Sequence, residues 1–166
     1  SPKETIMKVS DYMSPSPVTI DKDADYDSAF DIMKDGDLHH LPVVNKKGRV
    51  VGILARRDLQ LAARHFHEAP AEVADVMHKP VVTISPTASL ATAAKRMTEN
   101  RIGCLPVLNR GQQVVGMITE TDMFRALIDA LSGTSATGTA KPSGKTAAKK
   151  AARRKTTSRK KAAAKR

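Results

Sequence analysis

Two aspartates, Asp58 and Asp122, close segments of similar sequence, GILARRD and GMITETD. A hydroxyl residue, Thr119, stands three positions before Asp122, whereas Ala55 holds the matching position before Asp58. Thr and Asp are preferred at the start of a helix, where they cap free backbone N–H groups. The same helix end attracts anions. Capping and ligand binding are therefore both open roles for Thr119 and Asp122.

Basic residues directly precede the first of these aspartates. Arg56 and Arg57 are either phosphate contacts beside Asp58 or solvated charges at the start of a helix. Glu120 and Thr121 hold the matching positions before the second aspartate. The two segments therefore differ in charge.

A histidine pair, His39 and His40, precedes the strand-like run Leu41-Pro42-Val43. Successive strand residues point to opposite faces, so at most one of the two histidines faces a cleft. Histidine gains its charge near neutral pH, and phosphate binding at this position would strengthen as the pH falls. The alternative is a partly exposed pair at the start of a strand.

Residue combinations typical of catalysis are missing from the sequence. We find no Ser-His-Asp set, paired carboxylates or nucleophile elbow, so we expect a protein that is not an enzyme. The pair His65-x-His67 has no cysteine or acidic cluster around it, and no metal site is predicted. The one cysteine, Cys104, excludes an internal disulfide and is expected to be a small buried apolar residue.

An internal repeat organises the first 131 residues. Shifting the chain by 64 positions without a gap gives seventeen identities in the 51 positions from Val9 to Leu59. Repeated residues include Leu41-Pro42-Val43, which returns as Leu105-Pro106-Val107, and Asp58, which returns as Asp122. We place the first repeat at residues 8–67 and the second at 68–131.

Each repeat has the pattern of an α/β unit with the order β-α-β-β-α. A short β-rich run, at 17–20 and again at 81–84, precedes a helix whose apolar residues share one face. These residues are Tyr26, Ala29, Phe30 and Met33 in the first repeat and Leu90, Ala93, Ala94 and Met97 in the second. Two strands follow, at 41–45 and 49–55 in the first repeat, and a second helix closes each unit, at 57–66 and 121–131. Because each repeat is too small to bury a stable hydrophobic core by itself, we expect the two repeats to pack together with pseudo-twofold symmetry.

Charge divides the chain sharply at its C-terminal segment. Residues 132–166 hold twelve of the 28 Lys and Arg residues and none of the 17 acidic ones. They also lack every large apolar side chain, so this segment is expected to be disordered. No apolar run approaches the roughly 20 residues that cross a bilayer. We expect a cytoplasmic protein with no membrane partner. This expectation includes a protein associated with the nucleoid.

The repeats resemble the tandem cystathionine β-synthase (CBS) domain pair, also called a Bateman module. The resemblance covers residues 8–131 and is carried by VSDYM and VADVM, by LPVV and LPVL, and by GILARRD and GMITETD. It implies regulatory adenine-nucleotide sensing in clefts between the repeats, with AMP, ADP, ATP or S-adenosylmethionine as ligand and no other cofactor. It also implies a homodimer.

The same resemblance assigns roles to the site residues. In the family pattern Gly-x-x-[Ser/Thr]-x-x-Asp, the Asp binds ribose hydroxyls and the Ser/Thr lies near the phosphate. This pattern implies a complete site at Thr119 and Asp122 and an impaired one at Asp58. A basic residue faces the phosphates at the position of His39 or His40.

The C-terminal segment resembles the Lys/Ala-rich tails of linker histones in its composition. We expect such a segment to bind DNA or RNA through phosphates and without sequence specificity. The alternative for the segment is a solubilising tail or a tether to another acidic partner. An alternative for the whole chain is a dimeric, ligand-free architectural scaffold that binds DNA. The predicted contacts are Lys145, Lys149, Lys150, Arg153, Arg154, Lys155, Arg159, Lys160, Lys161, Lys165 and Arg166.

Overall fold

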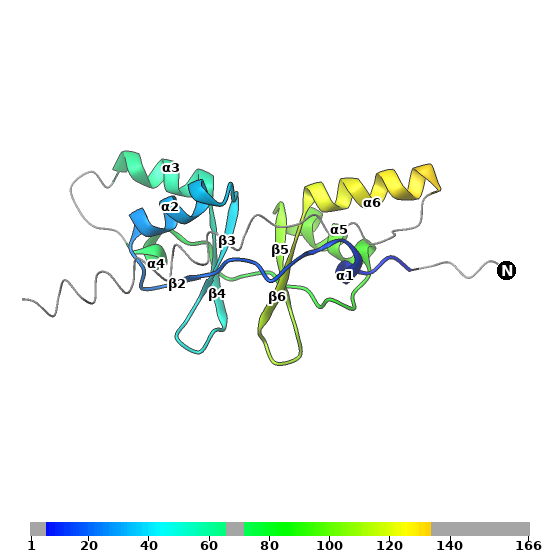
Figure 1. The fold of residues 1–166 in the computed structure, drawn as a ribbon, viewed down its shortest axis with the longest axis horizontal. Coiled ribbons are helices and arrows are strands. Elements are labelled where there is room, and N and C mark those ends of the chain that lie inside the picture. Colours follow the sequence, from blue (N-terminus) through cyan, green and yellow to red (C-terminus); the bar gives the residue numbers. More distant parts are fainter. Residues whose placement is uncertain (1–5, 66–71, 134–166) are drawn as a thin grey trace, which may run out of the picture. The chain divides into compact units, whose positions relative to one another are not determined.

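The computed structural model describes residues 6–65 and 72–133. These residues form two compact units, each with its own sheet (Figure 1). Each unit also has its own hydrophobic core. The first-repeat unit comprises residues 18–47, 51–65 and 72–79, and the second-repeat unit comprises residues 6–17, 48–50 and 80–133. Most of the predicted basic tail, with His67, lies outside the described residues.

The first-repeat unit has a three-stranded sheet in the order β2-β3-β4. Strand β2 runs parallel to β3, with Ile20 opposite Val43. The N-terminus of α2 is capped by Asp25, whose side chain accepts the Ser28 N–H at 2.8 Å. The elements are β2 (Ile20–Asp21), α2 (Tyr26–Asp35), β3 (His40–Val44), β4 (Val50–Ala55), α3 (Arg56–His65) and α4 (Val73–Val76).

The second-repeat unit also has a three-stranded sheet, in the order β1-β6-β5. Both β1 and β5 run antiparallel to β6, and Leu105 of β5 lies opposite Ile118 of β6. Strand β6 leads directly into α6, the longest helix of this unit. The elements are α1 (Val9–Tyr12), β1 (Ser14–Pro15), α5 (Leu90–Asn100), β5 (Cys104–Leu108), β6 (Val114–Thr119) and α6 (Glu120–Ser132).

The helix faces expected from the apolar spacing are confirmed for the most part. Ala29 and Met33 are buried on α2, and Ala93 and Met97 are buried on α5. Phe30 differs, because 38% of it stays exposed. Each unit therefore encloses an α/β core in which one helix face covers buried strand residues.

The compact units are not simply the two sequence repeats, because the opening residues of each repeat pack in the other repeat's unit. Val9 on α1 belongs to the core of the second-repeat unit, and Val73 on α4 belongs to the core of the first-repeat unit. Met77 lies so close to Gly52 that a side chain at position 52 would collide with its sulfur atom. These close contacts explain why short segments that open each repeat share a sequence pattern.

A tyrosine side chain links α1 to α6 by a hydrogen bond within the second-repeat unit. The Tyr12 hydroxyl donates to Asp129 Oδ2 at 2.8 Å. Burial and the neighbouring Asp129 raise the pKa of Tyr12 to about 12, so the phenol remains a donor at neutral pH.

We expect Tyr12→Phe to lower the free energy of unfolding by about 1.5–3 kcal/mol, because it removes a hydrogen bond to a charged acceptor. Urea denaturation measures the change. Tyr26→Phe is the matched control, since the Tyr26 hydroxyl donates at 2.9 Å to a neutral acceptor, the Leu59 carbonyl. A loss for Tyr26→Phe that equals or exceeds that for Tyr12→Phe would contradict the role given to charge.

Candidate functional site

The turn from β6 into α6 brings Thr119 and Asp122 together. Thr119 is the N-cap of α6, with extended backbone angles of φ −123° and ψ 167°. Asp122 Oδ2 accepts the Thr119 backbone N–H at 2.9 Å and the Thr119 hydroxyl at 3.0 Å. Asp122 is only 3% exposed. Asp122 therefore caps the start of α6, which was one of the two roles expected from the sequence. The cap fixes the orientation of this buried carboxylate.

A cation from the same helix holds the second oxygen of this carboxylate. Arg125 Nη1 donates to Asp122 Oδ1 at 3.1 Å, while about half of the Arg125 side chain is exposed. The sequence reasoning missed Arg125. Arg125 could have been found from its position three residues after Asp122, because oppositely charged side chains at this spacing lie side by side on a helix.

The matching turn from β4 into α3 has a different set of contacts. Asp58 Oδ2 accepts the Ala55 backbone N–H at 3.3 Å and lies 2.9 Å from His78 Nε2. Leu61 stands where the second repeat has Arg125. His78 was also missed, because residues twenty positions apart in the chain meet here only through the fold.

Of the two predicted arginines at this turn, one is engaged elsewhere. Arg56 Nη2 donates to the Met33 carbonyl at 3.0 Å and lies 3.4 Å from Asp37 Oδ1, at the end of α2. Arg57 is exposed. In this structure Arg57 is therefore the more accessible cation beside Asp58.

The predicted histidine pair lies at the start of β3. His39 is exposed just before the strand, and its carbonyl accepts the Arg56 backbone N–H at 2.9 Å. His40 is half-buried and is the first residue of β3. His39 is thus joined by a backbone hydrogen bond to the first residue of α3, two positions before Asp58.

The thiol at the matching place in the second repeat is not exposed. Cys104 is buried at the start of β5, as expected from the sequence. Burial, with a smaller effect of Glu120, raises the pKa of the Cys104 thiol to about 12. The thiol therefore stays protonated at neutral pH and is a poor nucleophile.

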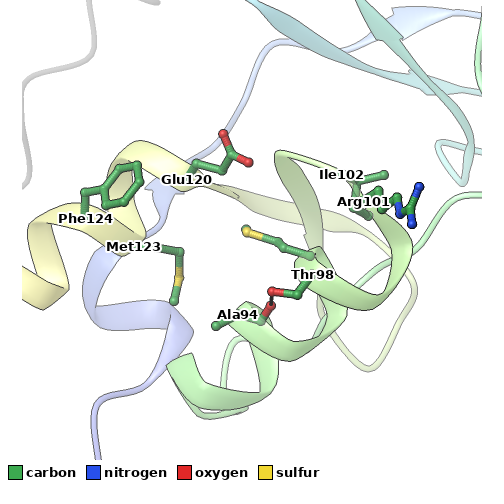
Figure 2. A pocket seen from close by; sticks show the side chains of 8 residues that line it. Ala94, Thr98, Arg101, Ile102, Glu120, Met123 and Phe124 are labelled. Atoms are coloured by element: carbon green, nitrogen blue, oxygen red, sulfur yellow. Dashed lines mark hydrogen bonds between the residues drawn. The ribbon is translucent and has the colours of Figure 1, made fainter.

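A separate surface pocket of about 410 Å³ lies between α5 and α6. Figure 2 shows α5 residues Ala94 and Thr98 facing α6 residues Met123 and Glu120 across it. Thr119 and Asp122 are not among its lining residues. This pocket and the Asp122 carboxylate are distinct features of the second-repeat unit.

The described residues offer neither a metal-ion cluster nor a membrane-spanning helix. Within residues 6–65 and 72–133, no group of three or more His, Cys, Asp or Glu side chains could hold a metal ion. None of the helices in that same part of the chain is long and apolar enough to cross a membrane.

Solved structures with the same fold include ligand complexes. The CBS domain pair of protein MJ0100, in complex with 5′-methylthioadenosine and S-adenosyl-L-methionine, is 26% identical with a TM-score of 0.69, over 75% of this chain and 98% of that chain. AcuB from Vibrio cholerae is 31% identical with a TM-score of 0.69, over 78% and 97%. CBSX2 in complex with AMP is 20% identical with a TM-score of 0.64, over 75% and 98%, and shows the fold alone.

Sequence comparison defines the family. A CBS domain-containing protein of Dictyostelium discoideum is 34% identical over 134 residues, covering 74% of this chain and 92% of that protein. A homoserine O-acetyltransferase of Methanococcoides burtonii is 32% identical over 123 residues, but the match spans only 25% of that protein and 74% of this chain. The CBS domain pattern matches residues 9–65 and 73–129, so the chain belongs to the CBS domain family and contains two CBS domains.

Proposed function

We propose that this chain is a regulatory protein that senses an adenine-based small molecule through its CBS domains and binds nucleic acid through its basic C-terminal segment. The sensing role is carried by the buried, oriented carboxylate of Asp122 at the start of α6. The likeness to a CBS domain pair solved with two adenosine compounds supports the ligand class. AMP, ADP, ATP and S-adenosylmethionine are the candidates.

Asp122 is suited to a ribose because a carboxylate accepts hydrogen bonds from both hydroxyls of a cis-diol. Thr119 presets its orientation, and the N-terminus of α6 favours an anionic group nearby. A ribose would compete with Arg125 for Oδ1. Arg125 is half-exposed, so displacing it costs about 1 kcal/mol or less.

The first CBS domain supplies a second, less complete site in this proposal. Asp58 would bind the ribose, while Arg57 and one of His39 and His40 would face the phosphates. Arg56 would join them only by leaving the Met33 carbonyl and Asp37.

A thermal-shift panel with the full chain tests the sensing role. AMP, ADP, ATP and S-adenosylmethionine are compared with GMP as a control for the base. A ligand at 100 times its Kd stabilises the folded state by about 2.7 kcal/mol. No shift with any of the four adenine compounds would refute the proposal.

The nucleic-acid role is supported by charge. The twelve Lys and Arg residues of 132–166 include all the expected phosphate contacts, from Lys145 to Arg166. Because no aromatic, Asn or Gln residue accompanies them, binding would follow phosphate density in DNA or RNA and not base sequence.

A homodimer is the proposed assembly, since large apolar side chains on α6 remain exposed in the chain by itself. They are Phe124, Leu127, Ile128 and Leu131. Burying them in a second copy would remove apolar surface from water.

We expect light scattering to give twice the chain mass for the wild type and the single mass for Leu127→Asp, because a charge cannot be buried unpaired at low cost. Leu127→Met keeps an apolar side chain and should remain dimeric. Identical masses for all three proteins would contradict this interface.

One observation favours the alternative of a ligand-free dimeric scaffold that binds DNA. Both oxygens of Asp122 already have partners within α6 and its N-cap, so the carboxylate has a structural role without any ligand. The scaffold hypothesis predicts DNA binding together with a flat thermal-shift panel.

A further inference from the structure

His78 is held in place by its backbone at the edge of β4. Its N–H donates to the Ile53 carbonyl at 2.8 Å, and the Ile53 N–H donates to the His78 carbonyl at 3.1 Å. This pairing directs the imidazole to Asp58, with Nε2 at 2.9 Å from Oδ2. The His78 side chain is 67% exposed, so it contacts the carboxylate from the solvent side.

Asp58 Oδ2 has little capacity left for another donor. It accepts the Ala55 N–H as well as the contact from His78. A carboxylate oxygen offers about two lone-pair positions. The backbone N–H is fixed by the start of α3, so an incoming hydroxyl must replace the imidazole to reach this oxygen.

In the second-repeat unit, Ser14 holds the position that His78 holds in the first-repeat unit. Ser14 pairs with Met117 as His78 pairs with Ile53, and both positions are related by the shift of 64 residues. The cation beside Asp122 comes instead from Arg125 on its own helix. Among the described residues, a histidine from another segment therefore contacts the Asp58 carboxylate, whereas the cation beside Asp122 comes from its own helix.

We propose that His78 is an internal competitor for Asp58, which lowers the affinity of the first CBS domain for a ribose-containing ligand and makes that affinity depend on pH. This inference rests on the proposed function. Histidine is charged at the acid end of the range from pH 5 to 8. The charged imidazole attracts the carboxylate more strongly, so ribose binding weakens as the pH falls.

Other charged groups surround this contact. Arg56 is bound to Met33 and Asp37, and Asp75 on α4 accepts the Glu72 N–H at 3.1 Å. Arg57, Lys79 and His39 are exposed, and His40 lies on β3. The two histidines before β3 are proposed to face phosphates, where protonation strengthens binding at low pH. The sign expected for His78 with an uncharged ligand is the opposite, so the two effects can be separated.

The test is calorimetric titration of the full chain with adenosine, which carries no phosphate, at pH 5.5 and pH 8.0. Asp122→Asn serves as the parent so that the first domain is observed alone. We expect the parent to bind adenosine up to about fivefold more tightly at pH 8.0, the range of an exposed ion pair. Adding His78→Ser, which reproduces Ser14, should tighten binding at pH 5.5 by up to about fivefold and flatten the pH dependence.

His78→Gln is the matched variant, since it keeps a donor but cannot gain charge; its binding should not vary with pH. Unchanged or weaker binding by His78→Ser, or a pH dependence that survives it, would overturn the inference. If the wild type binds neither adenosine nor AMP, or if Asp58→Ala leaves binding by the parent intact, the proposed site itself fails. These outcomes are distinct, and thermal unfolding of each variant verifies that it is folded.

Discussion

Asp122→Asn should abolish most of the thermal stabilisation that adenine-based ligands give to this chain. A hydrogen bond to a charged group contributes about 1.5–3 kcal/mol. Loss of the carboxylate charge therefore reduces affinity at the second CBS domain by about 10- to 100-fold. Asparagine has nearly the same shape and still offers one oxygen to the Thr119 N–H, so the cap of α6 is largely kept.

The control for this experiment is the unliganded protein. The melting temperature of Asp122→Asn without ligand reports the structural cost, and only the ligand-dependent shift reports the site. Asp58→Asn is the matched change in the first domain and should remove the smaller share of the response. If Asp122→Asn keeps the full ligand shift, Asp122 is a helix cap and not a ribose ligand.

Removal of residues 134–166 should reduce affinity for duplex DNA by about a thousandfold or more at low salt. The truncation takes away all twelve cationic side chains of the C-terminal segment and leaves α6 complete through Ser132. The remaining chain has sixteen basic and seventeen acidic residues, too balanced to release counterions from DNA. Fluorescence anisotropy with a labelled duplex at several salt concentrations measures the effect.

A chain with the residues of 134–166 in shuffled order is the matched control. It keeps every charge and should bind like the wild type with the same salt dependence, because phosphate contacts need no particular order. The truncated chain should retain its ligand-induced thermal shift. DNA binding that survives truncation, or that is lost on shuffling, would refute a non-specific phosphate-binding tail.

Much of the local structure could be predicted because it depends on neighbours in the chain. The spacing of Ala29 and Met33 predicts the buried face of α2. The internal repeat, found by shifting the sequence by 64 residues, predicts two units of the same design. The β-α-β-β-α order was confirmed with three differences: of the β-rich run at 17–20 only Ile20 lies in a strand, the run at 81–84 gives only an isolated bridge at Ile84, and α3 begins at Arg56. The pseudo-twofold packing of the repeats stays a prediction.

The exchange of opening segments could not be predicted in the same way. Helices α1 and α4 have four residues each, too short for a helical period to show in the sequence. Their place depends on long-range contacts, such as the Val9 N–H donating to the Ala88 carbonyl. The sequence indicated two repeats of one design. It did not indicate that the opening segment of each repeat packs against the sheet of the other.

The sequence by itself determined the duplicated α/β organisation, the position of Asp58 and Asp122 at helix starts, and the separation of charge between body and tail. These depend on period, alignment and composition, which are properties of the chain. Only the tertiary structure decided that His78 contacts the Asp58 carboxylate while Arg125 contacts that of Asp122. The physical reason is that a side chain brought in by the backbone pairing of His78 with Ile53 leaves no local pattern in the sequence, whereas Arg125 lies on the same helix as its carboxylate.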